Sequence, residues 1–154
     1  MATKTVSKDE LLTLSGTELP TSDWLTLSQE RVNSFADCTE DHQFIHVDQE
    51  KAKQTPFGGT IAHGFLTLSV LPKLAEDALI LPENLVFAMN YGFDKVRFLA
   101  PVRVGKRVRM NSKIISVEAK GDDRCLVKTG VSIEIEDEET PALIAEWLNM
   151  YVCG

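Results

Sequence analysis

Several features that would assign this chain of 154 residues to a special class are rare or absent. No apolar run approaches the ~18 residues that a membrane span requires, and the polar start MATKTVSKDE lacks the character of a signal peptide. Only three cysteines occur, widely spaced, which argues against a disulfide framework or a CxxC metal knuckle. We therefore expect a cytoplasmic protein in a reducing compartment, with no membrane partner.

Acidic residues are missing from one stretch, although the net charge of the chain is −7. Residues 95–113 contain seven basic residues and no acidic one. An acidic protein with one basic segment is a poor general nucleic-acid binder, so we expect no nucleic-acid partner. The segment suits a compact polyanion, such as a nucleotide phosphate group, about as well as it suits the solvated face of a strand or turn.

The periodicity of the second half of the chain predicts a sheet. After Pro82, segments near 85–99, 106–119, 124–136 and 142–152 are rich in Val, Ile, Phe and Met. The clearest two-residue period is Cys125, Val127, Thr129, Val131, Ile133 and Ile135. Turn residues join these segments as hairpins. With 44% hydrophobic residues, the chain fits one α+β domain, residues 1–154, with a single antiparallel sheet over residues 85–152.

The first half predicts helices and one long irregular segment. Ser28 is a candidate N-cap for a helix that ends near Thr39, after which residues 41–61 read as a long loop. Residues 63–79 are apolar on nearly every side, which predicts a buried central helix, bent at Pro72. Residues 1–22 form an N-terminal extension, with a short helix over residues 8–15.

All three histidines, His42, His46 and His63, fall within residues 35–71, and Asp41 precedes His46 by five residues. An Asp–His pair can hold a water molecule and move a proton near neutrality, since the ordinary histidine pKa is ~6.5. The plainer interpretation is that His46 caps a turn and Asp41 caps a helix or loop. Metal ligation by His42 and His46 is disfavoured, because no cysteine completes the site. A phosphate-binding loop and a nucleophile elbow lack their key residues.

Residues 35–46, FADCTEDHQFIH, resemble the hydratase signature of the MaoC-like dehydratases, the (R)-specific 2-enoyl-CoA hydratases with a hot-dog fold. The similarity is greatest to the subgroup that includes nodulation protein N-like proteins. It continues through IAHGFLTL at residues 61–68, NYGFDKVRF at residues 90–98, Ala100-Pro101-Val102 and Gly105. It covers nearly the whole chain from Trp24.

The resemblance implies a curved antiparallel sheet wrapped around a long central α-helix, with residues 35–62 overhanging it as the catalytic segment. It implies reversible hydration of a trans-2-enoyl thioester, carried by CoA or acyl carrier protein, without metal or redox cofactor. Asp41 and His46 would hold the water, and the Gly64 N–H would donate to the thioester oxygen. Candidates for supporting roles are Gln43, His63 and Ser69, and candidates for CoA-phosphate contacts are Arg97 and Arg103. Hot-dog proteins pair, so a homodimer or higher homo-oligomer is expected.

One departure from the family pattern concerns Glu40, which stands where the commoner signature has glycine. Glycine there permits a positive φ at the helix end, so the direction of the Asp41 side chain stays open. Two alternative functions also stay open. A hot-dog thioesterase would need a carboxylate on the central helix, and residues 65–71 contain none. A non-catalytic acyl-CoA-binding module would not need an intact Asp41/His46 pair.

Overall fold

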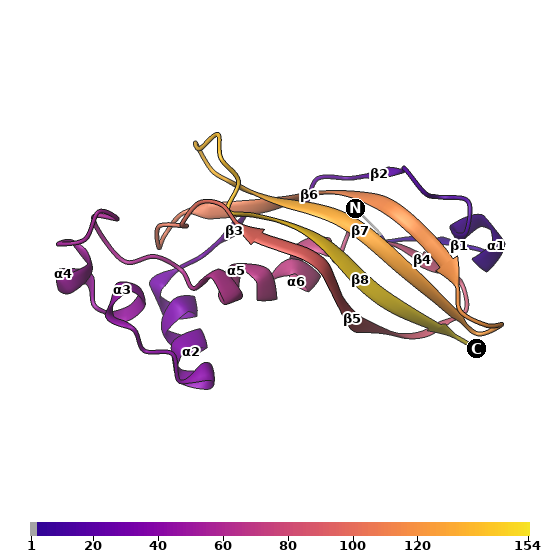
Figure 1. Ribbon diagram of the computed structural model, residues 1–154, viewed down its shortest axis with the longest axis horizontal. Helices are drawn as coiled ribbons and strands as arrows, with labels where there is room; N and C mark the ends of the chain where they lie inside the picture. Colours follow the sequence, from indigo (N-terminus) through magenta and orange to yellow (C-terminus); the bar gives the residue numbers. More distant parts are fainter. Residues whose placement is uncertain (1–2) are drawn as a thin grey trace.

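The computed structural model describes residues 3–154 and shows a long, twisted antiparallel sheet (Figure 1). Its order is β2-β6-β7-β8-β5, and a short strand, β3, also pairs with β6. The four long strands are Leu85–Phe98 (β5), Arg107–Ala119 (β6), Arg124–Ile135 (β7) and Leu143–Cys153 (β8). Each lies within one residue of its predicted bounds. The predicted antiparallel α+β sheet is confirmed.

Strand β7 shows why the periodicity was informative. Its buried and half-buried positions alternate from Cys125 to Ile135, and the buried ones face the helices or the N-terminal segment. The turn before it contains Gly121, with φ +78°, and the turn after it contains Asp137, with φ 60°. Both residues occupy the left-handed region that tight turns demand, which glycine and aspartate tolerate best.

The predicted central helix is divided in two: α5 (Gly64–Ser69) and α6 (Leu71–Ala75), separated at Val70. A bend was expected at Pro72, and the break falls two residues earlier. Proline has no N–H to donate and its ring clashes with the carbonyl four residues before it, so Pro72 fits only the first turn of a new helix. The predicted helix over residues 63–79 is therefore shorter and interrupted.

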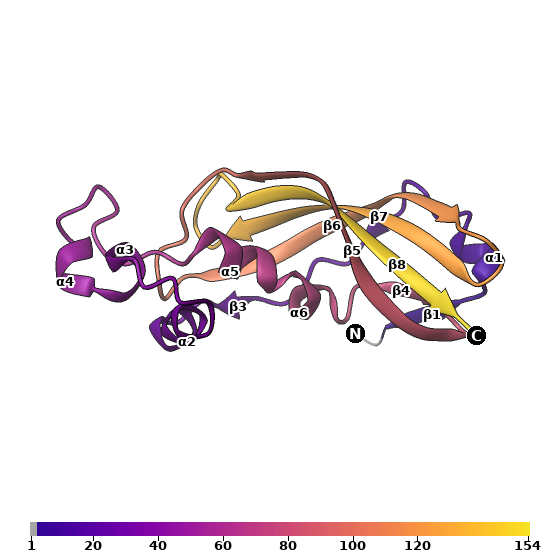
Figure 2. The same ribbon diagram turned by 60° about the horizontal axis from the view of Figure 1, so that its bottom comes forward.

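The helices α5 and α6 lie against one face of the sheet (Figure 2). A large apolar cluster joins Leu66, Leu71 and Leu74 to Val108 of β6 and Ile133 of β7. The opposite side of α5 is open, and the Phe65 side chain is 68% exposed. Complete burial of this helix was expected from its apolar circumference, and this is wrong for the chain alone, because a single sheet covers only one side of a helix.

At the other end of the sheet, a second apolar cluster holds the N-terminal segment. Strand β1 (Lys4–Val6) pairs in parallel with β4 (Ile80–Pro82), and α1 (Lys8–Leu11) follows. Leu11 packs in a cluster with Tyr151. Strands β2 (Glu18–Leu19) and β3 (Leu25–Thr26) pair with β6. The first two residues of the predicted extension lie outside the described residues.

Residues 28–63, called the overhang below, project beyond one end of the sheet (Figures 1 and 2). They contain α2 (Gln29–Thr39), α3 (Phe44–Val47) and α4 (Gln49–Ala52). The Ser28 side chain caps α2 as predicted, accepting the Arg31 N–H at 3.1 Å. The two short helices α3 and α4 lie within a stretch predicted as loop. No helix among residues 3–154 is long and apolar enough to cross a membrane.

Candidate active site

The Asp41 segment leaves α2 through a left-handed residue. Glu40 has φ 63° and ψ 21°, the conformation for which the family pattern uses glycine. The backbone thus makes the expected turn with glutamate in place. Asp41 then bends back toward α3, where its Oδ1 accepts the Gln43 N–H at 3.3 Å. The carboxylate therefore lies just before α3, the helix that carries His46.

His46 is buried, with 7% of its surface exposed, and its imidazole is fixed by a main-chain hydrogen bond. Its Nδ1 lies 2.8 Å from the carbonyl oxygen of Ile61. A carbonyl oxygen can only accept, so Nδ1 carries the proton and Nε2 of the neutral ring has a free lone pair. The Ile61 N–H in turn donates to the Ile45 carbonyl at 2.9 Å, which holds the two segments together.

Burial lowers the pKa of His46 below its ordinary 6.5, and the nearby His63 lowers it further. The hydrogen bond to Ile61 and the charge of Asp41 act in the opposite direction without reversing the shift. Desolvation disfavours the charged form of an imidazole. His46 is therefore neutral at pH 7 and can serve as a base through Nε2.

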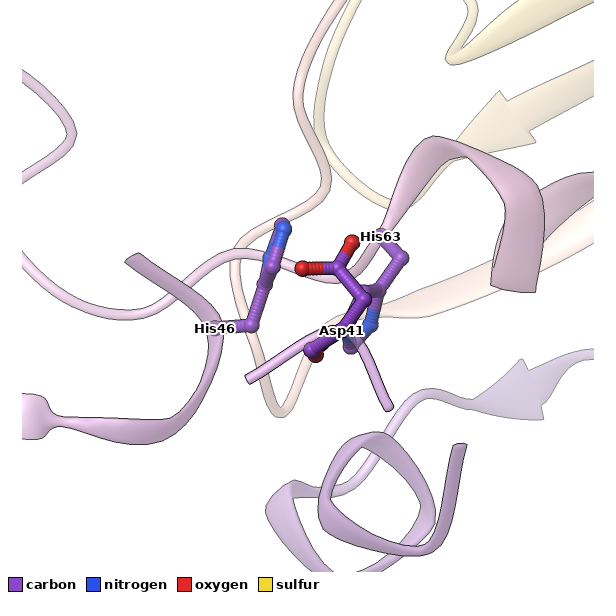
Figure 3. A group of neighbouring side chains, drawn as sticks. All are labelled: Asp41, His46 and His63. Carbon is purple, nitrogen blue, oxygen red and sulfur yellow. The ribbon is translucent and has the colours of Figure 1, made fainter. Parts of the chain in front are cut away.

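His63 completes the cluster from the start of α5. It is 2% exposed, and its ring stacks on that of His46 with centroids 3.8 Å apart and 25° between the planes. Its Nε2 lies 3.0 Å from the main-chain carbonyl oxygen of Asp41. Figure 3 shows the Asp41 carboxylate turned toward the His46 imidazole, with the His63 ring near the main chain of Asp41. One ligand atom of each of the three side chains lies within 4.8 Å of the others.

This trio has the donor types of a zinc site, but its geometry does not fit one. Two imidazoles that share a tetrahedral zinc, at Zn–N distances of ~2.0–2.1 Å, point their nitrogens at it from different directions. Rings stacked at 3.8 Å cannot do so without moving. His42 is not a member of the trio: its Nε2 pairs with Asp37 Oδ1 at 2.9 Å on the surface. The His42/His46 metal pair considered from the sequence is therefore not assembled.

A cavity of about 320 Å³ opens beside this cluster and is mostly apolar in its lining. His46 and Gly64 both line it, together with Thr67 and Phe98. A Cβ at Gly64 would lie 3.1 Å from two atoms of the Phe98 ring. The first N–H groups of a helix have no partner within it, and Leu66 is the first residue of α5 whose N–H bonds to the His63 carbonyl. Gly64 thus combines a close approach with a free backbone donor.

Two other residues predicted for the site, Gln43 and Ser69, do not line the cavity that contains His46 and Gly64. Gln43 contributes its backbone N–H to Asp41 and immediately precedes α3. Ser69 is exposed, donates to the Phe65 carbonyl at 2.6 Å, and lines a separate cavity with Asn90 and Trp147. The structure thus brings Asp41, His46, His63 and Gly64 together.

The basic stretch separates into paired and unpaired residues. Four of its side chains form ion pairs with glutamates on the sheet and its neighbouring segments: Lys106, Arg107, Arg109 and Lys113. For these four the plain interpretation of a solvated strand face is sufficient. Arg97 and Arg103 are exposed and have no acidic partner within residues 3–154; Arg103 donates to the Gly58 carbonyl at 3.2 Å.

The sequence reasoning missed Gln29, which connects four parts of the overhang. Its Nε2 donates to the His46 carbonyl at 2.8 Å and to Asn33 at 2.9 Å. Its Oε1 accepts from Thr60 at 2.7 Å and from Gln49 at 3.0 Å. Nothing in the spacing indicates this role, because a glutamine at the start of a helix is ordinarily solvated.

A carboxylate and a neutral buried imidazole beside an apolar cavity, on a hot-dog sheet, define a hydro-lyase type of site. Residues 11–136 match the model of the MaoC like domain, and the chain belongs to this family. It is 46% identical to 3-hydroxyacyl-thioester dehydratase Z of Mycobacterium tuberculosis (strain ATCC 25618 / H37Rv) over 143 residues, covering 93% of this chain and 94% of the relative.

Two further similarities extend the comparison. The chain is 42% identical to nodulation protein N of Rhizobium meliloti (strain 1021), covering 93% of this chain and 89% of the relative. Its fold matches the crystal structure of the MaoC-like dehydratase from Rhodospirillum rubrum with a TM-score of 0.76, at 18% identity, covering 97% and 98% of the two chains. The expectations of a MaoC-like hot-dog protein, a hydro-lyase, are confirmed.

Proposed function

We propose that the chain hydrates trans-2-enoyl-CoA thioesters reversibly and (R)-specifically to 3-hydroxyacyl-CoA, using one water molecule held by Asp41 and His46. The observation that carries this proposal is the free lone pair of His46 Nε2. Its ring lines the cavity that Gly64 also lines, and the Asp41 carboxylate lies beside it. An acceptor nitrogen and a carboxylate can together orient a water toward a bound acyl chain.

In this reaction the water oxygen bonds to C3, and the electrons of the C2=C3 double bond move toward the thioester carbonyl. The water loses one proton to the Asp41/His46 pair, and C2 receives one proton from the same pair. Because the pair both takes and returns a proton, it is unchanged after each turnover. Positioned acid–base groups of this kind contribute ~10²–10⁴-fold to a rate.

The enolate oxygen needs a donor, and the Gly64 N–H supplies it in this proposal. Loss of one such donor typically costs ~10²–10³-fold in rate. Helix α5 has only six residues, so we assign the stabilisation to the N–H group itself. Gly64 also leaves room beside Phe98, which a side chain would fill.

The carrier would lie outside the cavity. Arg97 and Arg103 keep exposed guanidinium groups with no acidic partner within residues 3–154, which supports a contact with the phosphates of CoA. The same contact could serve the phosphopantetheine of an acyl carrier protein. The three free thiols, Cys38, Cys125 and Cys153, support the cytoplasmic location included in this proposal.

A homodimer belongs to the same proposal. Strand β5 forms one edge of the sheet and exposes large apolar side chains, among them Val86, Met89 and Tyr91. The open side of α5 adds Phe65. A long apolar edge strand promotes pairing with another chain, and a second copy would cover both surfaces.

Thioester hydrolysis is less well supported. A hot-dog thioesterase uses a carboxylate on the helix, and the segments GFLTLS of α5 and LPKLA of α6 contain none. A non-catalytic acyl-CoA-binding module would have no use for a neutral imidazole with a free Nε2 beside a carboxylate. We therefore place hydration first.

The test is the loss of enoyl absorbance when the purified chain is mixed with crotonyl-CoA. Activity should persist as the pH falls to about 6.5 and decline only below it, because the pKa of the base His46 is lowered from that value. Chiral analysis of the product should give (R)-3-hydroxybutyryl-CoA. Release of free CoA without hydroxyacyl product would instead identify a thioesterase.

A further inference from the structure

We infer that His63 is a positioning residue for the active site: held as the Nε2–H tautomer, opposite to that of His46, it fixes the main chain of Asp41 and supports the His46 ring. The catalytic consequence rests on the proposed function, whereas the tautomers rest on geometry alone. His63 itself touches no reacting atom in this proposal.

The hydrogen bonds of the two histidines determine which nitrogen carries the proton. Both acceptors are main-chain carbonyl oxygens, Ile61 for Nδ1 of His46 and Asp41 for Nε2 of His63. A carbonyl cannot donate, so each contacting nitrogen must be the donor. In the neutral rings, His46 is therefore the Nδ1–H tautomer and His63 the Nε2–H tautomer.

Nδ1 of His63 is buried and has no hydrogen-bond partner within the described residues. Leaving a buried polar atom unpaired costs ~1–3 kcal/mol. Phenylalanine would fill the same space against His46 and Phe35 without this cost. The presence of histidine rather than phenylalanine at position 63 is therefore explained by Nε2, which donates to the Asp41 carbonyl.

That carbonyl lies at a demanding place in the backbone. It directly follows Glu40, whose left-handed conformation glutamate adopts less readily than glycine. The His63 Nε2–H group donates to the carbonyl of the next residue, Asp41. This hydrogen bond helps to hold the turn and thus the direction of the Asp41 side chain. The main-chain carbonyl of His63 meanwhile accepts from Leu66 and Thr67, which begins α5 at Gly64. His63 thereby contacts the Asp41 main chain and the His46 ring, and it immediately precedes the Gly64 N–H.

The tautomers can be tested without any assay of hydration. The chain has only three histidines, so ¹⁵N spectra of histidine-labelled protein at pH 8 are simple to assign, using His63→Gln and His42→Gln. We expect one signal pair typical of an Nδ1–H ring for His46 and one typical of an Nε2–H ring for His63. Equal tautomers for the two rings, or fast averaging at His63, would overturn the inference.

The positioning role is tested by two variants that separate the hydrogen-bond donor of His63 from its aromatic ring. His63→Gln keeps a donor at the reach of Nε2 but removes the ring, whereas His63→Phe keeps the ring and removes the donor. Misplacement of a catalytic group by about 1 Å can cost ~10²-fold, so we expect His63→Phe to lower kcat ~10–100-fold with little change in KM. His63→Gln, which keeps the donor to Asp41 and loses the stacking on His46, should lose less of the rate than His63→Phe.

Non-additivity separates positioning from a general loss of packing. In the Asp41→Asn background, His63→Phe should cause little further loss of kcat, because the carboxylate it positions is already gone. Wild-type kcat in His63→Phe, with the loss confined to His63→Gln, or full additivity with Asp41→Asn, would show that the residue only packs. If the wild type failed to hydrate crotonyl-CoA, the proposed function would fall while the tautomers were still decided by the spectra.

Discussion

The β6–β7–β8 part of the sheet and the overhang are held together by different interactions. In the sheet, alternating residues such as Val131 and Ile133 pack against α5 and α6 in one apolar cluster. In the overhang, Val32 also joins this cluster, but polar side chains connect the segments around the candidate site. Gln29 holds the His46 and Thr60 segments, and His63 holds the Asp41 segment. Loss of one apolar side chain in the sheet leaves the atoms of the candidate site in place, whereas loss of one of these polar side chains releases the segment that it holds.

The two kinds of interaction suit the two tasks of these regions, which are stability for the sheet and placement of the candidate site residues for the overhang. Apolar packing is non-directional and scales with buried area, so it supplies stability without fixing any atom to a fraction of an ångström. Hydrogen bonds are directional and fix the atoms they join. We therefore expect changes in the overhang to affect catalysis first, and changes in the sheet to affect stability first.

The largest effect should come from the proposed catalytic pair, Asp41 and His46. Asp41→Asn and His46→Ala should each lower the hydration rate ~10²–10⁴-fold. Asp41→Asn should leave the melting temperature nearly unchanged because Asp41 is exposed, whereas His46→Ala should also lower it, since a buried ring and its hydrogen bond to Ile61 are lost. Combined, they should cost far less than the product of the two, because both groups hold one water. His42→Ala is the matched control, a histidine of the same segment that pairs with Asp37 on the surface. Near-wild-type turnover in both single variants would remove the pair from the mechanism.

The counterpart in the sheet is Ile133→Ala. Ile133 is completely buried on β7, and truncation of such a side chain typically costs ~2–5 kcal/mol of unfolding free energy. Chemical denaturation should show this loss, while kcat per folded molecule stays within about twofold. Ser132→Ala, on the other face of the same strand, should change stability by less than ~0.5 kcal/mol. A large fall in kcat without a loss of stability in Ile133→Ala would contradict the proposed division.

The difference between sheet and overhang also explains what could be predicted from the sequence. Strands β5 to β8 could be predicted from a two-residue period, because successive residues of a half-buried strand lie on opposite faces of the sheet. The catalytic roles proposed for Asp41, His46 and Gly64 rest on the resemblance to a family, since composition and spacing also allowed simple capping roles.

The remaining features depend on contacts that are distant in sequence. Gln29 and Thr60 are 31 residues apart, and His63 and Asp41 are 22 apart, so no local pattern relates them. The break at Val70 required weighing Pro72 against an otherwise uninterrupted helical pattern. The open side of α5 could not be read from residue types, because an apolar side chain looks the same whether the chain itself or a second copy covers it.

A moderate effect is expected from Gln29→Met, which keeps the length of the side chain and removes all four of its hydrogen bonds. The His46 carbonyl and the buried Thr60 hydroxyl would each lose a partner, so stability should fall by ~1–3 kcal/mol. In contrast to Ile133→Ala, kcat should fall with it, by roughly tenfold, because the backbone of the base is released. Gln49→Ala, which removes only one exposed contact with Gln29, is the control. Loss of stability with unchanged kcat would show that the overhang behaves like the sheet.

The smallest effect concerns the basic stretch, which belongs to the sheet by position but to the site by its proposed role. If Arg97 and Arg103 meet the phosphates of CoA, then Arg97→Gln and Arg103→Gln should each raise KM for crotonyl-CoA a few-fold. The value of kcat should hardly change, because these contacts are remote from C3 and serve ground state and transition state alike. The wild-type KM should also rise with salt, and less steeply in the variants, since screening weakens exposed charge contacts.

Arg107→Gln is the matched control for this prediction, because the Arg107 guanidinium already pairs with Glu136. A pantetheine thioester without the nucleotide should show neither the salt dependence nor the rise in KM. Arg103 also holds the Gly58 carbonyl, so its variant can disturb the overhang, and a fall in kcat confined to Arg103→Gln would report that contact. If KM for the CoA substrate is indifferent to salt and to both substitutions, the whole stretch is a solvated strand face, and the carrier is bound elsewhere.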